Sequence, residues 1–174
     1  KPIRVIVGFA PGGSADFTAH TIGHALTESL GQQVVVDNRA GASGIIGLDL
    51  AARANPDGYT LVEATMTTHG IGPNVYKKLP YDPVKSFEPI VLMVSVPLVM
   101  FAHNSVPGAT LKDVVAAVKA NPNKYRYASA GNGSPPHLAA ELFKLKAGVE
   151  LVHVPYKGTG AAVPDVVAGQ VHFM

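Results

Sequence analysis

Short apolar runs alternate with longer amphipathic stretches along the first part of the chain. The pattern predicts strands over residues 3–8, 34–36 and 59–64, and helices over residues 15–30 and 45–54. Gly31 is expected to close the first helix, because glycine adopts the left-handed backbone conformation found after many helices. Alternation of strand and helix with short connections is typical of an α/β fold, in which helices flank a parallel sheet.

The middle of the chain is less regular. Residues 74–87 contain two prolines and predict an irregular connection on the surface. Residues 89–102 form the longest apolar stretch, which is too short to span a bilayer. We therefore expect two buried strands there, one on each side of Pro97. Thr110 and Asp113 then fit a capping box that opens a helix ending near residue 120.

The strand and helix alternation restarts in the second half. Strands are predicted over residues 125–129, 151–154 and 171–174, and helices over residues 136–147 and 161–168. The restart predicts two lobes, at residues 1–101 and 102–174. Because the chain stops inside a predicted strand, we expect it to be part of a longer protein that supplies the remainder of both lobes. A chain of this length is expected to expose apolar surface, to associate and to bind ligand weakly.

Composition narrows the function classes. The 174 residues are 47% hydrophobic and 15% charged, with a net charge of +2 and no run of basic residues. This argues against a nucleic-acid partner and against direct membrane insertion. The absence of cysteine excludes thiol nucleophiles, disulfides and cysteine metal sites. No signal peptide precedes the first strand, so Lys1 is interpreted as a mature or trimmed N-terminus.

Two segments share a chemical feature: a strand, a glycine-rich loop and then a helix. The first loop contains Gly12 and Gly13, and the second contains Gly131 and Gly133. Backbone N–H groups at a helix N-terminus favour a bound anion, because the donors are unpaired and the helix dipole is positive there. The repetition predicts two lobes that close on one small anionic ligand, with both loops facing one cleft.

Several other residues suggest competing chemistry. The glycines at positions 8, 12 and 13 do not fit a dinucleotide fingerprint, although Asp37 follows the second strand where a ribose-binding acid would lie. A nucleotide-dependent α/β enzyme therefore stays open as an alternative. His20 and His24 share a helix face but lack a third ligand, so no metal is expected. Ser129 and Ser134 lie outside a G-x-S-x-G elbow, which disfavours a hydrolase.

The order of several motifs gives a more specific signal. They are FAPGGSAD at the start, then NRAGASG, NPDGYTL, YKKLPYDPVKSFEPI, YASAGNGSPPHLAAELF and HVPYKGTG. Together they cover nearly the whole chain and resemble the solute-binding proteins of tripartite tricarboxylate transporters, the Bug family. The chain differs from the family pattern at His20, where arginine is usual, and the family continues well beyond residue 174.

The resemblance implies a type II periplasmic-binding-protein fold with two lobes and no catalysis. It implies a periplasmic receptor that captures a small carboxylate, needs no cofactor and delivers its ligand to the membrane components of a transporter. An effector domain of a transcription regulator, which can share this fold, is a second alternative. The expected ligand-binding residues are Phe9, Gly12, Gly13, Ser14, Ala15, Asp16, Thr65, Thr68, Ser129, Gly131, Gly133, Ser134, His137 and Tyr156.

Overall fold

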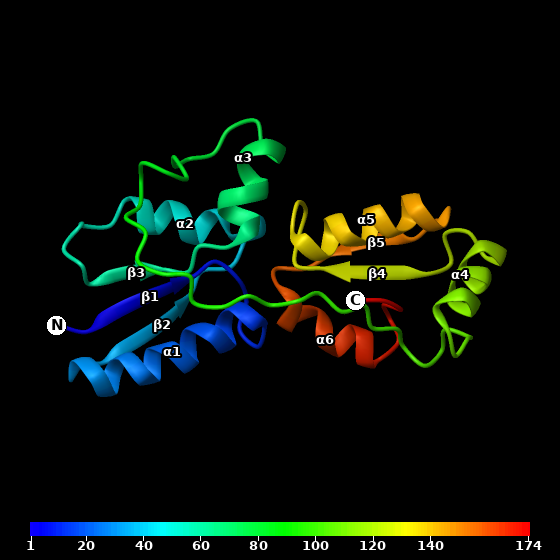
Figure 1. Cartoon of the computed structure of the whole chain (residues 1–174), viewed down its shortest axis with the longest axis horizontal. Helices are drawn as coiled ribbons and strands as arrows, with labels where there is room; N and C mark the ends of the chain where they lie inside the picture. Colours follow the sequence, from blue (N-terminus) through cyan, green and yellow to red (C-terminus); the bar gives the residue numbers. More distant parts are fainter.

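A three-stranded parallel sheet organises the first half of the computed structural model, which describes residues 1–174 (Figure 1). The central strand β1 (Ile3–Val7) lies between β2 (Val34–Asn38) and β3 (Thr60–Val62). All the pairings are parallel. Almost every side chain of β1 is buried, as expected for a central parallel strand covered on both faces.

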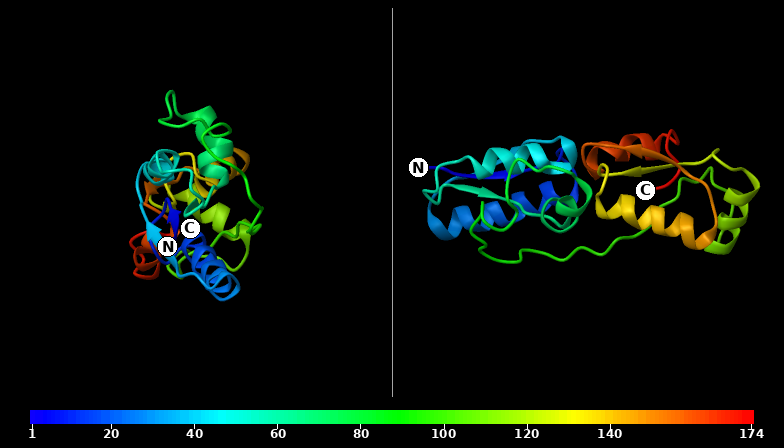
Figure 2. Two further views of the ribbon diagram at one scale, coloured as in Figure 1. Left: turned by 90° about the vertical axis from the view of Figure 1, so that its left-hand side faces the viewer. Right: turned by 90° about the horizontal axis from the view of Figure 1, so that it is seen from above.

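Helices lie on both faces of this sheet (Figures 1 and 2). On one face lies α1 (Ser14–Leu30), and on the other lies α2 (Ile45–Ala52), which follows the short 3₁₀ turn η1 (Ala42–Gly44). The π-helical turn η2 (Met66–Ile71) and α3 (Gly72–Val75) follow β3. Gly31 adopts the left-handed conformation and its N–H bonds to Thr27 O, which confirms the predicted end of α1. We call β1 to α3 the N-terminal unit.

The C-terminal unit, α4 to α6, lies beside the N-terminal unit (Figure 1). Its two parallel strands are β4 (Arg126–Ser129) and β5 (Val152–Pro155). Its helices are α4 (Leu111–Ala120), α5 (Pro135–Ala147) and α6 (Thr159–Val167). Figure 1 shows α5 and α6 on opposite faces of the sheet. The predicted capping box at the start of α4 is confirmed by reciprocal bonds between Thr110 and Asp113.

The end of the chain pairs with the second sheet through isolated bridges. Phe173 bridges Tyr127 in parallel and Ala102 in antiparallel orientation. The predicted strand over residues 171–174 is therefore reduced to a single bridging residue. Phe173 is buried in the same cluster as Tyr127, so this contact anchors residues 102 and 173 to the C-terminal unit.

The prediction of two buried strands in residues 89–102 is wrong. Only Ala102 makes a β-bridge. The segment has no regular secondary structure and runs extended from one unit toward the other (Figure 2, right). Its apolar side chains are exposed, and Leu92 reaches 84% exposure. Apolar character predicted burial, yet no strand of the chain lies alongside residues 89–100 to supply ladder hydrogen bonds. Only at the end of the segment does Phe101 exchange backbone hydrogen bonds with Met174, at 2.7 and 3.0 Å. By contrast, the irregular course predicted for residues 74–87 is confirmed after the last turn of α3.

The exposed apolar segment predicts self-association of the 174-residue chain, since contiguous apolar patches of this kind drive association. Light scattering is expected to give a mass above the 18.1 kDa monomer. Replacing Leu92 and Val99 by lysine should lower that mass toward the monomer. Val84→Lys changes an equally exposed residue outside the segment and should have little effect. A monomeric wild-type chain at all concentrations would contradict the prediction.

Candidate functional site between the two units

The loop after β1 presents unpaired amides at the start of α1. Gly12 has a positive φ of 82°, and its N–H donates to Asp16 Oδ2 at 2.9 Å. The N–H groups of Gly13, Ser14 and Ala15 donate no hydrogen bond within the chain. Three free donors therefore lie at the positive end of a 17-residue helix, where the dipole favours an anion.

Asp16 holds this loop in place through hydrogen bonds. Its Oδ1 accepts a hydrogen bond from Asn38 Nδ2 at 2.9 Å, and the same amide group donates to Phe9 O at 3.1 Å. Burial acts to raise the pKa of Asp16, but the bonds from Gly12 and Asn38 outweigh it, so the pKa is lowered. Asp16 therefore stays ionised and fixes Gly12 in place.

A second helix N-terminus faces the first one across the two units. The Ala10 N–H donates to Lys157 O at 2.8 Å, which joins the loop after β1 to the loop before α6. Thr159 and Gly160, which open α6, lie so close to Gly13 that a Cβ on Gly13 would be 2.9 Å from Thr159 Oγ1. The N–H groups of Thr159, Gly160 and Ala161 also donate no hydrogen bond within the chain.

The start of α6 was missing from the residues expected from sequence. The available signal was the pair of glycines at positions 158 and 160, which lie directly before and inside the start of α6. Gly158 has a φ of 137° and packs against the Ala10 nitrogen and the Phe9 side chain. A side chain at position 158 would therefore separate the two units.

The glycine loop after β4 is built differently from the loop after β1. Its amides are used internally: Gly131 N–H donates to Ser129 Oγ at 3.1 Å, and Gly133 N–H donates to His137 Nδ1 at 3.1 Å. Pro135 and Pro136 occupy the first turn of α5 and have no N–H to offer. The expected free amides at Gly131 and Gly133 are therefore already bonded, and the two glycine loops are not equivalent anion sites.

The same loop nevertheless lies against the N-terminal unit. Asn132 O accepts hydrogen bonds from Ser43 Oγ at 2.8 Å and from Tyr76 OH at 2.9 Å. Ala130 belongs to a buried cluster that also contains Phe9 and Val7 from the N-terminal unit. Phe9 is thus mainly a packing residue between the units. Sequence reasoning missed Ser43, Tyr76 and Asn132, because hydrogen bonds between distant loops leave no local pattern.

Ser134 does not cap α5, contrary to one role that its position before the helix suggests. Its hydroxyl donates to Gly131 O at 2.7 Å, and the residue is fully buried. Ser134→Ala is therefore expected to lower the free energy of unfolding by about 1 kcal/mol through loss of a buried hydrogen bond. Chemical denaturation measures this. Reduced stability with unchanged ligand affinity would remove Ser134 from the ligand site, while reduced affinity would keep it there.

The hydroxyl-rich segment after β3 forms the helical turn η2. Thr65 and Thr68 form a reciprocal cap at the start of η2, with Thr65 N–H donating to Thr68 Oγ1 at 3.1 Å. Thr68 O also accepts from Tyr81 OH at 2.9 Å. Both predicted ligand residues therefore have structural partners, and Thr68 is buried.

The remaining predicted residues form a polar cluster within the C-terminal unit. Ser129 Oγ lies 2.7 Å from His153 Nε2, and the His153 ring stacks on His137 at 4.3 Å between centroids. Burial and then the charge of His137 lower the pKa of His153. The Ser129–His153 contact has the spacing of a nucleophile and its base, but Ser129 is only 1% exposed, which leaves no access for a substrate carbonyl.

The Tyr156 side chain makes its hydrogen bond within the C-terminal unit. Its hydroxyl donates to Asp165 Oδ2 at 2.5 Å, and burial followed by that carboxylate raises the pKa of Tyr156 to about 12. The structure thus brings the starts of α1 and α6 and the loop after β4 to one interface between the units. It gives Thr65, Thr68 and Tyr156 partners within their own units.

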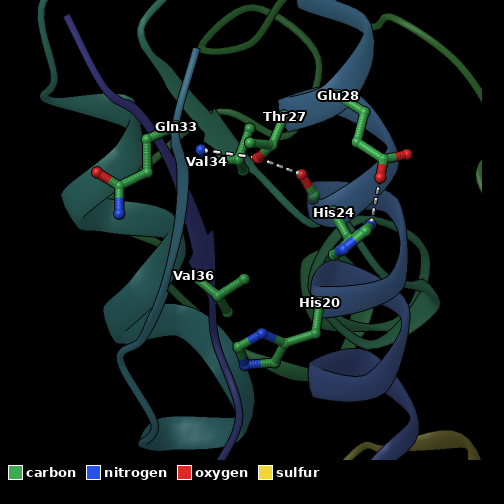
Figure 3. Close-up of a pocket in the computed structure, with 8 residues that line it drawn as sticks. His20, His24, Thr27, Glu28, Gln33, Val34 and Val36 are labelled. Atoms are coloured by element: carbon green, nitrogen blue, oxygen red, sulfur yellow. Dashed lines mark hydrogen bonds and ion pairs between the residues drawn. The ribbon is translucent and has the colours of Figure 1, made fainter. Parts of the chain in front are cut away.

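Two surface hollows lie away from this interface. One, of about 290 Å³, lies between α1 and β2 and is lined partly by His20, His24 and Glu28 (Figure 3). In it His24 Nδ1 lies 3.7 Å from Glu28 Oε1. The other, also about 290 Å³, lies beside His103 and the end of α6. No group of three or more His, Asp or Glu side chains is placed to hold a metal ion.

Comparison with known proteins identifies the family. Residues 18–174 match the family model described as tripartite tricarboxylate transporter family receptor. The chain belongs to this family. None of its helices is both long and apolar enough to cross a membrane. The chain spans about half the length of the curated relatives it matches, 52% and 53% in two of them.

Solved structures of family relatives have the same fold. A periplasmic transporter superposes with a TM-score of 0.95 at 45% identity, over 99% of this chain and 58% of its own. Rpa4515 from R. palustris, solved with adipate, gives a TM-score of 0.95 at 35% identity, over 99% and 57%. MatC from Rhodopseudomonas palustris, solved with bound malate, gives 0.91 at 33% identity, over 99% and 59%. The expected α/β fold of periplasmic binding proteins is confirmed, and the family is one of receptors rather than enzymes.

Proposed function

We propose that the full-length protein is a periplasmic receptor that captures a small carboxylate between two lobes and delivers it to the membrane components of a tripartite transporter. The lobes correspond to residues 1–101 and 102–174, each completed by further chain. The observation that carries the proposal is the approach of two helix N-termini, those of α1 and α6, whose first amides have no partner within the chain.

Physical chemistry supports a carboxylate as the ligand of these amides. Unpaired N–H groups at the positive end of a helix stabilise negative charge without a fixed cation. No lysine or arginine side chain is among these free donors. Neutral backbone amides would therefore hold the negative charge of the ligand. Neutral donors bind an anion reversibly, which suits a receptor that must release its ligand to a partner.

The proposed ligand site takes the free amides of Gly13, Ser14 and Ala15 from α1 and those of Thr159, Gly160 and Ala161 from α6. In addition to these, we keep the predicted residues Phe9, Gly12, Asp16, Thr65, Thr68, Ser129, Gly131, Gly133, Ser134, His137 and Tyr156 as the surrounding shell. Among them, Asp16 and Ser129 hold the loops in place, and Phe9 packs the two units together.

The relatives guide the choice of probe ligands. Adipate and malate were bound by two structural relatives and are both dicarboxylates. Calorimetry on the full-length protein with each acid, and with its neutral diamide at the same concentration, tests the proposal. The acids should bind and the diamides should not, because only the acids present an anion to the amides. Binding of neither acid, or equal binding of acid and diamide, would overturn it.

A nucleotide-dependent enzyme is the main competing function, and NAD in the same titration separates the two. The absence of a glycine fingerprint for the pyrophosphate disfavours it. The family match also supports transport over the effector domain of a transcription regulator.

A further inference from the structure

Glu63 is a buried carboxyl group without a partner, at the carboxyl end of the first sheet. It follows β3 directly, and its N–H donates to Ile6 O at 3.0 Å, so its backbone continues the ladder with β1. The residue is only 7% exposed. Its Oε2 is the one buried side-chain oxygen or nitrogen in the chain that makes no hydrogen bond. Such a group is costly, since buried polar atoms are normally paired.

The side chain lies on the sheet face that α1 covers. Strand side chains alternate between faces, so Glu63 shares its face with Leu61. Leu61 packs against the cluster of Val5, Val7 and Ala19, and Ala19 belongs to α1. Asp16, one turn earlier on α1, is the carboxylate that fixes the Gly12 amide at the proposed ligand site. Glu63 therefore lies beneath the loop that would receive the ligand.

The charged groups around Glu63 do not neutralise it. Asp16 is ionised, and the exposed His20 on the same helix places its Nε2 3.5 Å from Asp16 Oδ1. Asp37 at the end of β2 is paired with Arg4 and Arg39. His69 on η2 bonds to Thr68 and packs against Tyr81 and Phe87. No cation on these elements forms an ion pair with Glu63.

We propose that Glu63 makes ligand capture proton-linked: the protein binds a carboxylate best when Glu63 is neutral, and takes up a proton at Glu63 on binding. This rests on the proposed function. With Glu63 ionised, a ligand carboxylate would enter beside two negative charges, Asp16 and Glu63. With Glu63 protonated, Asp16 alone remains, and it is already satisfied by Gly12 and Asn38. The affinity for the ligand then depends on pH through the protonation of Glu63, which lies beneath the amides.

The titration range of Glu63 fits this role. Burial, followed by the charge of Asp16, raises the pKa of Glu63 to about 7. Glu63 is therefore partly protonated in the neutral range, and an anion bound above it raises its pKa further, because a nearby like charge disfavours the ionised form. Proton uptake on binding is the thermodynamic consequence.

Calorimetry on the full-length protein tests the linkage, with malate and adipate as probes. Affinity should be about fivefold to tenfold higher at pH 6 than at pH 8.5, the effect of a pKa rise of about one unit in the complex. At pH 7, titrations in buffers of different ionisation enthalpy should reveal proton uptake. Glu63→Gln should bind with similar affinity at both pH values and without that uptake, since glutamine has no proton to gain.

Glu88→Gln is the matched control, because Glu88 is exposed. It should retain the wild-type pH dependence and proton uptake. Wild-type binding of equal strength at pH 6 and pH 8.5, or proton uptake that persists in Glu63→Gln, would overturn the linkage while leaving the proposed function intact. Failure of both acids to bind at either pH would overturn the proposed function and the linkage with it.

Discussion

Replacing Gly160 by alanine is expected to hold the two units apart and to weaken carboxylate binding. A Cβ at position 160 would lie 2.6 Å from the Gly13 nitrogen, and closer still to Pro11 O and Gly12 C. These are backbone atoms, so no side-chain rotation relieves the overlap. Overpacking costs about 1–3 kcal/mol, and if the cost falls on the closed form alone, affinity drops by roughly 5- to 150-fold.

Small-angle scattering and calorimetry on the full-length protein measure this effect. The variant should have a larger radius of gyration in the presence of ligand than wild type, and alanine should not weaken α6 itself, since it is a better helix former than glycine. Gly70→Ala is the control, because a Cβ there meets only Met66 at an ordinary contact distance of 3.5 Å. Wild-type affinity and scattering in Gly160→Ala would show that closure does not use this contact.

Replacing Glu63 by glutamine is expected to stabilise the protein at alkaline pH. Because the pKa of Glu63 is raised from 4.5 to about 7, the folded state holds a proton that the unfolded state releases. The free energy of unfolding of the wild type should therefore fall as pH rises from 4.5 to about 7. A shift of this size corresponds to about 3 kcal/mol, and partial solvent screening reduces it to about 2 kcal/mol.

Thermal unfolding across pH 4.5 to 8.5 checks this prediction. Glutamine keeps the shape of the side chain without the charge, so the variant should gain roughly 4–8 °C in melting temperature at pH 8 and almost nothing at pH 4.5. The exposed Glu88→Gln should follow the wild type at every pH. A pH-independent gain in Glu63→Gln would mean that packing, and not ionisation, sets its effect.

The elements within each unit were predictable from sequence because local signals agreed. Apolar runs marked β1 and β4, Gly31 marked the end of α1, and Thr110 with Asp113 marked the start of α4. Residues 89–102 were mispredicted because apolar composition predicts burial only where other strands or helices supply the covering surface. In this chain that surface is absent, and the segment stays extended and exposed.

Only the part of the candidate site at the start of α1 could be predicted from the sequence. The glycine loop before α1 was correctly predicted to have free amides. The similar loop before α5 was expected to have them too, but its amides donate to the side chains of Ser129 and His137. Nor did sequence show that α6 faces α1, because that placement depends on how the two units pack. The role proposed for Glu63 could not be predicted from sequence, because a glutamate after a short strand is usually exposed, and only the structure shows that this one is buried.

A crystal structure of the full-length protein with malate or adipate bound would test the proposed ligand site directly. We expect a ligand carboxylate within hydrogen-bond distance of amides from both Gly13–Ala15 and Thr159–Ala161, with the loops of the two units in contact around it. A ligand bound outside this interface, or loops of the two units on opposite surfaces of the complete protein, would contradict it.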